Sequence, residues 1–281
     1  MKRLLVIAGS DSGGGAGIQA DIKTAAAFGI YTMTAVTAVT AQNTQGLSAL
    51  TLMPPKLVAA QIRACLDDIG ADAIKIGMLG SAAIVRAVAR ELAQVRVPIV
   101  LDPVLVATSG RRLLPEAAIS ALKTCLIPKA SLITPNLPET YALLGVRPRS
   151  SEARAAAARH LIALGASAVL IKGGHSTKPV LEDVLVWSGG IARYDFARLK
   201  TRHTHGTGCT YATAIACGLA EGLVLPQAVA RARRYLQGAI RTAPGLGHGH
   251  GPLNHAFAPD KPGAHRHRGT RRAAPGTHHG H

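Results

Sequence analysis

The sequence predicts an α/β fold with a parallel central sheet, and two observations support this. Short runs rich in Val, Ile and Leu alternate with longer Ala- and Leu-rich runs over residues 1–258, as expected for right-handed βαβ units. The short runs are also almost continuously apolar, which is typical of strands covered by helices on both faces.

The elements follow this alternation along the chain. Five apolar runs predict strands, at residues 4–9, 72–77, 98–104, 131–136 and 168–174. The segments between and after them predict helices, at 16–28, 55–68, 81–94, 115–126, 152–164, 207–221 and 226–242. Residues 183–189 and 191–196 read as an antiparallel hairpin that turns at Ser188-Gly189-Gly190.

We expect one domain over residues 1–258 and a disordered tail over 259–281. The tail is rich in His, Arg, Gly and Pro and has almost no large apolar residue, so burial cannot offset the entropy lost on ordering. Its histidines are suited to weak metal binding.

Composition excludes several classes of protein. Hydrophobic residues make up 48% of the chain and charged residues 17%, which is typical of globular proteins, and no apolar run has the length of a membrane-spanning helix. The four cysteines form no C-x-x-C pair, which favours a reducing cytoplasm. The N-terminal residues read as a first strand rather than as a signal peptide.

The net charge of +17 raises the question of nucleic-acid binding. The tail holds five Lys/Arg and one acid, and the remaining charge of +13 is spread over many helices without interleaved aromatic residues. Nucleic-acid binders concentrate their charge in a patch or stripe. An anionic small-molecule substrate accounts for the charge equally well.

A glycine-rich turn follows the first predicted strand. The stretch "GSDSGGGAGIQADIKT" lacks the spacing of a dinucleotide-binding G-x-G-x-x-G and of a P-loop, because Ile18 stands at the third position after Gly15 and no Gly lies before Lys23. The turn allows a small ligand to approach the backbone closely, with Asp21 one helical turn further on. A tight turn without a ligand is the alternative.

The stretch "HGTGC" is a stronger signal. Gly206, Thr207 and Gly208 precede a helix of small residues, and backbone N–H groups at a helix N-terminus favour an oxyanion or phosphoryl group. Helix N-termini also lower the pKa of a thiol, so Cys209 is a candidate thiolate. The alternative is a small packed residue.

Polar residues end three of the predicted strands. Asn136 and Glu139 in "TPNLPE" lie three residues apart, on one side of a short helix, where they are suited to Mg²⁺ or to an ordinary helix cap. Asp102 in "LDPVLVATSG" is suited to Mg²⁺ or to a turn. Lys172 in "LIKGGH" is placed to neutralise a transferring phosphate.

The histidines do not predict a structural metal site. His203 and His205 alternate in an extended segment and are expected to point to opposite faces. The "GHGHG" stretch at 247–251 lacks an acidic or Cys partner.

Taken together, "AGSDSGGGAGIQADIKT", "TAVTAQNTQG", "KIGMLG", "LDPVLVATSG", "LITPNLPE", "IKGGH" and "HTHGTGCT" resemble the hydroxymethylpyrimidine/phosphomethylpyrimidine kinases of thiamin biosynthesis. These enzymes belong to the ribokinase-like superfamily. The resemblance runs in the same order from residue 4 to about 256 and includes the "GHGHGPLNH" ending.

The resemblance implies a three-layer αβα sandwich with a predominantly parallel sheet. It implies a cytoplasmic ATP-dependent phosphotransferase that phosphorylates 4-amino-5-hydroxymethyl-2-methylpyrimidine and then its monophosphate, with Mg²⁺. Its partners would be the pyrimidine and ATP, without nucleic acid or membrane, and a homodimer is compatible with it.

The resemblance also assigns residues to roles. The pyrimidine pocket would be formed by Gly9, Ala16, Asp21, Gln42, Met78 and Val104, with Gln42 reading the amino and nitrogen edge of the ring. The transferring phosphoryl group would be held around Gly206, Gly208 and Cys209. Mg²⁺ and water would be organised by Asp102, Asn136 and Glu139, and ATP would meet Lys172, Thr207 and Arg233.

Two positions depart from the family pattern, and three rival interpretations stay open. Thr108 and Arg233 stand where related sequences usually carry Lys.

The rival interpretations are a pyridoxal or pyridoxine kinase, a non-catalytic pyrimidine-binding protein of the same fold, and a basic nucleic-acid binder. Relatives such as ribokinase have an Asp that acts as the base at the position of Cys209, whereas the pyrimidine kinases resemble this chain in having Cys. A thiolate at this position can also accept the hydroxyl proton.

Overall fold

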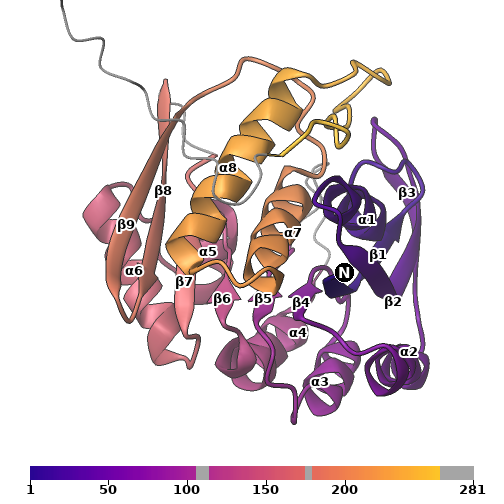
Figure 1. Ribbon diagram of the computed structural model, residues 1–281. Coiled ribbons are helices and arrows are strands. Elements are labelled where there is room, and N and C mark those ends of the chain that lie inside the picture. Colours follow the sequence, from indigo (N-terminus) through magenta and orange to yellow (C-terminus); the bar gives the residue numbers. More distant parts are fainter. Residues whose placement is uncertain (106–113, 175–178, 260–281) are drawn as a thin grey trace, which may run out of the picture.

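A computed structural model describes residues 1–105, 114–174 and 179–259 (Figure 1). Nine strands form one sheet in the order β3-β2-β1-β4-β5-β6-β7-β8-β9. The strands are β1 (Arg3–Asp11), β2 (Tyr31–Gln42), β3 (Leu47–Leu52), β4 (Ala73–Ile76), β5 (Ile99–Leu101), β6 (Leu132–Ile133), β7 (Ala168–Ile171), β8 (Val180–Trp187) and β9 (Gly190–Ala197).

The sheet is mainly parallel. Strands β2, β1, β4, β5, β6 and β7 pair in parallel, whereas β3, β8 and β9 add antiparallel edges. The chain builds outward from β1 to β2 and β3, and then returns to the other side of β1 with β4. This reversal places a crevice beyond the carboxyl ends of β1 and β4, where open α/β sheets bind ligands.

Helices cover both faces of the sheet. One apolar core packs α1 (Gly17–Ala27), α7 (Thr207–Ala220) and α8 (Leu225–Arg241) against the sheet, on the face toward the viewer in Figure 1. The other core packs α2 (Pro55–Asp68), α3 (Ala82–Glu91), α4 (Glu116–Ala121), α5 (Leu137–Leu144) and α6 (Ser151–Ala163) against the opposite face. The three-layer αβα sandwich is therefore confirmed.

The predicted elements agree closely with the observed ones. Helix α2 has the predicted bounds, and the hairpin of β8 and β9 turns where expected. The predicted helix at 115–126 forms α4 and continues as a π-helical segment, Leu122–Leu126. Strands β2 and β3 are absent from the predicted set. The helices in the described ranges are too short or too polar to cross a membrane.

Two predictions fall on residues outside the described ranges. Thr108 lies in the segment 106–113, and the proposed tail lies almost entirely in 260–281.

Candidate active site

A cavity of about 720 Å³ opens at the carboxyl ends of the parallel strands. It reaches from the glycine turn after β1 to the start of α7 and the far end of α8. All but one of the candidate residues named from the sequence line it, namely Gly9, Ala16, Gln42, Met78, Asp102, Val104, Asn136, Glu139, Lys172, Gly206, Thr207, Gly208, Cys209 and Arg233. Residues spread over more than 200 positions of sequence thus meet in one place.

Asp21 is the exception, and its predicted place in the pyrimidine pocket is corrected. Its carboxylate is fully buried beneath the site, where it accepts hydrogen bonds from Lys75 Nζ at 2.7 Å and Thr213 Oγ1 at 2.7 Å. Because α1 turns this position toward α7 and β4, the side chain faces the protein interior. Asp21 thus links Lys75 and Thr213 beneath the cavity.

The N-terminus of α7 forms one wall of the cavity. Gly206 caps the helix in the left-handed conformation, with φ at +81°, and a Cβ there would overlap the carbonyl oxygen of Gly15. The first N–H groups of a helix have no acceptor within it. With the positive end of the helix dipole they favour an anion at this wall.

Cys209 lies in the first turn of this helix as an uncharged thiol. Burial raises its pKa to about 11, and the neighbouring Asp21 and Asp102 carboxylates add to the effect, although Lys75 opposes it. The raised pKa argues against the expected thiolate at neutral pH, although Cys209 is only half-buried. Cys209 faces the cavity as a hydrogen-bonding S–H group.

Two carboxylates and one ammonium group lie beside this wall. Lys172 Nζ is 2.8 Å from Asp102 Oδ1 and 3.9 Å from Glu139 Oε2. A Cβ on Gly208 would lie 3.3 Å from Asp102 Oδ2 and 3.5 Å from Lys172 Nζ, so these charges are in contact with the helix start. Thr134 Oγ1 donates to Asp102 Oδ1 at 3.0 Å.

This charge arrangement fits a divalent cation. Burial, together with Asp102 and against Lys172, raises the pKa of Glu139 to about 7. When Glu139 is ionised, two buried carboxylates face one ammonium group, which leaves a surplus of negative charge. Hard oxygen donors with surplus negative charge are what Mg²⁺ requires.

The helix-cap interpretation of the Asn136 and Glu139 pair is confirmed, and the Mg²⁺ interpretation stays a prediction. Asn136 Oδ1 accepts from the backbone N–H of Glu139 at 2.8 Å, and Glu139 Oε2 accepts from the backbone N–H of Asn136 at 2.8 Å, a complete capping box for α5. The same residues line the cavity. The cap therefore holds the Glu139 carboxylate in place toward Lys172.

Arg233 lines the far end of the cavity, but its charge is engaged. Its guanidinium forms an ion pair with Asp183, which is fully buried, and stacks over the rings of Phe196 at 3.8 Å and Tyr211 at 4.1 Å. Asp183 also accepts from the backbone N–H of Gly173 at 2.8 Å. These contacts hold the Arg233 guanidinium in place at this end of the cavity.

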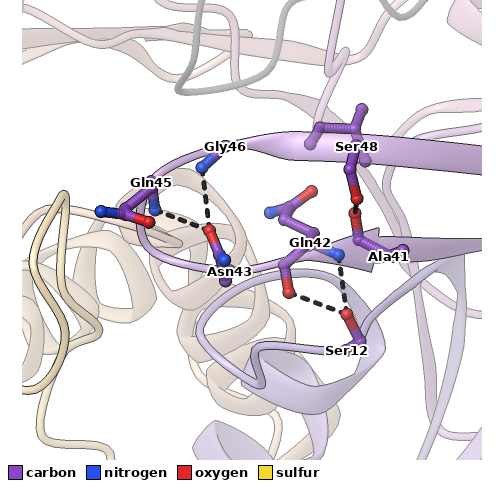
Figure 2. Close-up of a pocket in the computed structure, with 8 residues that line it drawn as sticks. Ser12, Ala41, Gln42, Asn43, Gln45, Gly46 and Ser48 are labelled. Carbon is purple, nitrogen blue, oxygen red and sulfur yellow. Dashed lines mark hydrogen bonds between the residues drawn. The ribbon is translucent and has the colours of Figure 1, made fainter.

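The end of the cavity near β1 and β4 is lined by Gly9, Gln42 and Met78. A Cβ on Gly9 would lie 2.7 Å from Met78 Cε, so the glycine allows Met78 to lie flat against β1. Gln42 borders this end and also a shallower hollow of about 500 Å³ in the turn between β2 and β3, which Figure 2 shows. A flat ring of pyrimidine size fits this end.

Sequence reasoning missed three charged residues of the site. Asp11 and His205 line the cavity, with His205 Nε2 2.8 Å from Asp11 Oδ2. Lys75 lies fully buried beneath it. A lysine inside the apolar strand "DAIKIG" was the available signal, because a buried Lys requires a partner. No signal links Asp11 to a histidine 194 residues away.

Comparison with known proteins identifies the family. Residues 11–254 match the family described as phosphomethylpyrimidine kinase. The chain is 46% identical over 256 residues to a hydroxymethylpyrimidine/phosphomethylpyrimidine kinase of Streptomyces coelicolor, with 91% of this chain and 94% of that one covered. It is 48% identical to the thiamine biosynthesis bifunctional protein ThiED of Geobacter sulfurreducens, of which the match spans 52%.

Solved structures agree. The phosphomethylpyrimidine kinase of Clostridium difficile has a TM-score of 0.77 at 37% identity, over 85% of this chain and all of that one. The ADP complex of Bacillus subtilis pyridoxal kinase has a TM-score of 0.85 at 33% identity, over 92% and 98% of the two chains. The fold, the cavity and these matches together show that this chain belongs to the phosphomethylpyrimidine kinase family.

Proposed function

We propose that the protein transfers the γ-phosphoryl group of ATP to 4-amino-5-hydroxymethyl-2-methylpyrimidine, and then to the resulting monophosphate to give the diphosphate. The observation that carries this proposal is one cavity that brings Gln42 and Met78 together with the N-terminus of α7. Two relatives named hydroxymethylpyrimidine/phosphomethylpyrimidine kinase, at 44% and 46% identity, support it.

Each end of the cavity has a part in the reaction. The ring lies between Gly9, Met78 and Val104, so its hydroxymethyl group points toward Cys209 and the N–H groups of α7. The hydroxyl oxygen attacks the γ-phosphorus, the bond from phosphorus to the β-phosphate oxygen of ADP breaks, and the hydroxyl proton passes to water late in the transfer. Because phosphoryl transfer has a loose transition state, positioning and charge matter more than a strong base.

Lys172 and the helix start stabilise the charge that is transferred. The ammonium group and the α7 N–H groups face one another across Gly208, so both reach an anion between them. Asp102 and Glu139, with Asn136, would hold Mg²⁺ directly or through water, and bound Mg²⁺ would neutralise phosphate charge. Thr207 and Arg233 border the ATP end.

A product assay tests the proposed function. The full-length protein with ATP, Mg²⁺ and the hydroxymethylpyrimidine should yield monophosphate first and diphosphate later, separated by ion-exchange chromatography. Pyridoxal is the matched competing substrate, because pyridoxal kinases of Bacillus subtilis and Staphylococcus aureus share this fold at TM-scores of 0.85 and 0.84. A higher kcat/KM with pyridoxal would overturn the assignment in favour of a pyridoxal kinase.

Replacing Cys209 by Ala should lower kcat about 10- to 100-fold, at or below the lower limit for a general base, while pyrimidine binding is retained. The reason is that the protonated thiol orients the hydroxyl rather than accepting its proton at neutral pH. Iodoacetamide labelling of Cys209, followed by mass spectrometry, should still accelerate above pH 9, since thiolate forms toward a pKa of about 11. A labelling plateau near pH 7 would contradict this; Cys65→Ala is the control.

We further propose that the reaction takes place in the cytoplasm, where ATP is available and free thiols stay reduced. The four cysteines are free, which is compatible with this location. The homodimer compatible with the family resemblance is tested by sedimentation equilibrium.

A further inference from the structure

A chain of polar contacts joins the glycine turn after β1 to Gln42. His205 Nε2 lies 2.8 Å from Asp11 Oδ2 and 3.0 Å from Nε2 of the Gln42 amide. Asp11 and His205 are 4% and 7% exposed, so water competes little for these contacts. All three side chains border the cavity.

Asp11 is the fixed end of this chain. Its carboxylate accepts from the backbone N–H groups of Gly13 at 2.9 Å, Gly15 at 3.1 Å and Ala16 at 2.8 Å. Burial acts to raise the pKa of Asp11, but the His205 contact and these N–H groups outweigh it, so the pKa is lowered. Asp11 is therefore an ionised acceptor that offers no proton.

An ionised acceptor determines which atom of His205 carries a proton. A ring nitrogen with a lone pair would repel the carboxylate at 2.8 Å, so Nε2 must carry the hydrogen and donate it. The amide of Gln42 meets this same N–H group. An amide and its flipped form exchange oxygen and nitrogen, and hydrogen bonding decides between them. Two donors cannot bond to each other, so a hydrogen on His205 Nε2 requires the Gln42 amide to be turned by 180°, with its oxygen in place of Nε2 toward His205.

The main chain of Gln42 is fixed as well. Ser12 Oγ donates to the Gln42 carbonyl oxygen at 2.8 Å and accepts from its N–H at 2.8 Å, as Figure 2 shows. The pairing of β2 with β3 shifts register between Ala41 and Gln42, which re-aims the side chain. The turn between β2 and β3 is held by a hydrogen bond from the backbone N–H of His250 to the Thr44 carbonyl oxygen, at 2.8 Å.

We propose that Asp11 and His205 are positioning residues that orient the Gln42 amide, with its NH₂ group toward the cavity and its oxygen shared with His205. This inference rests on the proposed function. The NH₂ group then donates to the ring nitrogen next to the amino-bearing carbon of the pyrimidine. The second lone pair of the oxygen accepts from the amino group itself. The site thereby selects a ring with adjacent acceptor and donor.

The test compares two substrates in four proteins. The substrates are the hydroxymethylpyrimidine and its analogue with CH in place of that ring nitrogen. The proteins are the wild type, His205→Leu, His205→Gln and His203→Leu. Gln can place an N–H near the Nε2 position, whereas His203 lies on the same segment without bordering the cavity.

The wild type should prefer the pyrimidine by about 10- to 100-fold in kcat/KM, which is the size of one buried hydrogen bond. His205→Leu should reduce this preference to about threefold or less, with the KM for ATP unchanged. His205→Gln should restore most of the preference, and His203→Leu should leave it intact. If His205 had only a structural role, His205→Leu would lower kcat/KM equally for both substrates.

The outcomes separate this inference from the proposed function. A wild type that phosphorylates neither substrate overturns the proposed function. An active wild type whose preference survives in His205→Leu overturns the role of His205. Should His205→Leu fail to fold, ¹⁵N NMR of the wild-type imidazole decides, because a proton on Nε2 supports the inference and a lone pair there overturns it.

Discussion

Replacing Lys172 by Met should lower kcat about 100- to 1,000-fold, the range measured for loss of one preorganised charge-stabilising group. Lys172 Nζ lies between Asp102 and Glu139, and both carboxylates are buried. Without the ammonium group, these two negative charges would face the incoming phosphates uncompensated. Pyrimidine binding should persist, because Lys172 pairs with Asp102 and Glu139 and is not among the proposed ring-binding residues.

Steady-state kinetics with both substrates, and calorimetric titration with the pyrimidine, measure these two quantities separately. Lys56→Met is the matched control, since Lys56 is exposed on α2. A kcat within tenfold of wild type would contradict the role of Lys172. Loss of pyrimidine binding together with kcat would instead indicate a disrupted fold.

Replacing Lys75 by Met should lower the free energy of unfolding by about 3–5 kcal/mol, the usual cost of removing one partner from a buried ion pair. Lys75 Nζ and Asp21 Oδ2 are 2.7 Å apart, and both side chains are fully buried. Burial disfavours the ammonium charge, but Asp21, Cys209 and Asp102 together raise the pKa of Lys75. The Met variant would leave the Asp21 carboxylate buried with only Thr213 as a donor.

Urea denaturation measures this change. The double variant Lys75→Met with Asp21→Leu is the decisive companion, because an apolar pair can replace a buried ion pair at little cost. It should be more stable than Lys75→Met alone. A double variant less stable than the single one would show that Asp21 contributes to stability through Thr213 and packing rather than through the pair.

The clearly patterned elements were predictable from sequence, whereas the β2–β3 side of the sheet was not. Helix α2 and the β8–β9 hairpin follow their patterns closely. Strand β2 reads "YTMTAVTAVTAQ", in which Ala and Thr leave little contrast between the buried and exposed faces. Strand β3 is short and largely exposed, and it exists through its pairing with β2.

The site was predictable to the extent that its residues end strands or begin helices. Asp102, Asn136 and Lys172 meet because parallel strands end at one edge, and a backbone bridge joins the last two. The depth of burial was not readable from sequence. Burial places Asp21 beneath the site, and it raises the pKa of the half-buried Cys209 thiol, against the expectation from its position on the helix.

The contact between Gly206 and Gly15 limits which residues can change when such an enzyme adapts to a new acceptor substrate. Here the main chain of the phosphate wall touches the main chain of the glycine turn, with no room for a side chain between them. In the proposed function, the distance from the acceptor ring to the phosphorus would therefore be set by these two main-chain segments. Side chains such as Gln42 and Met78 can change to admit a new acceptor while that distance stays fixed. One scaffold can therefore exchange one vitamin precursor for another without rebuilding its transfer chemistry.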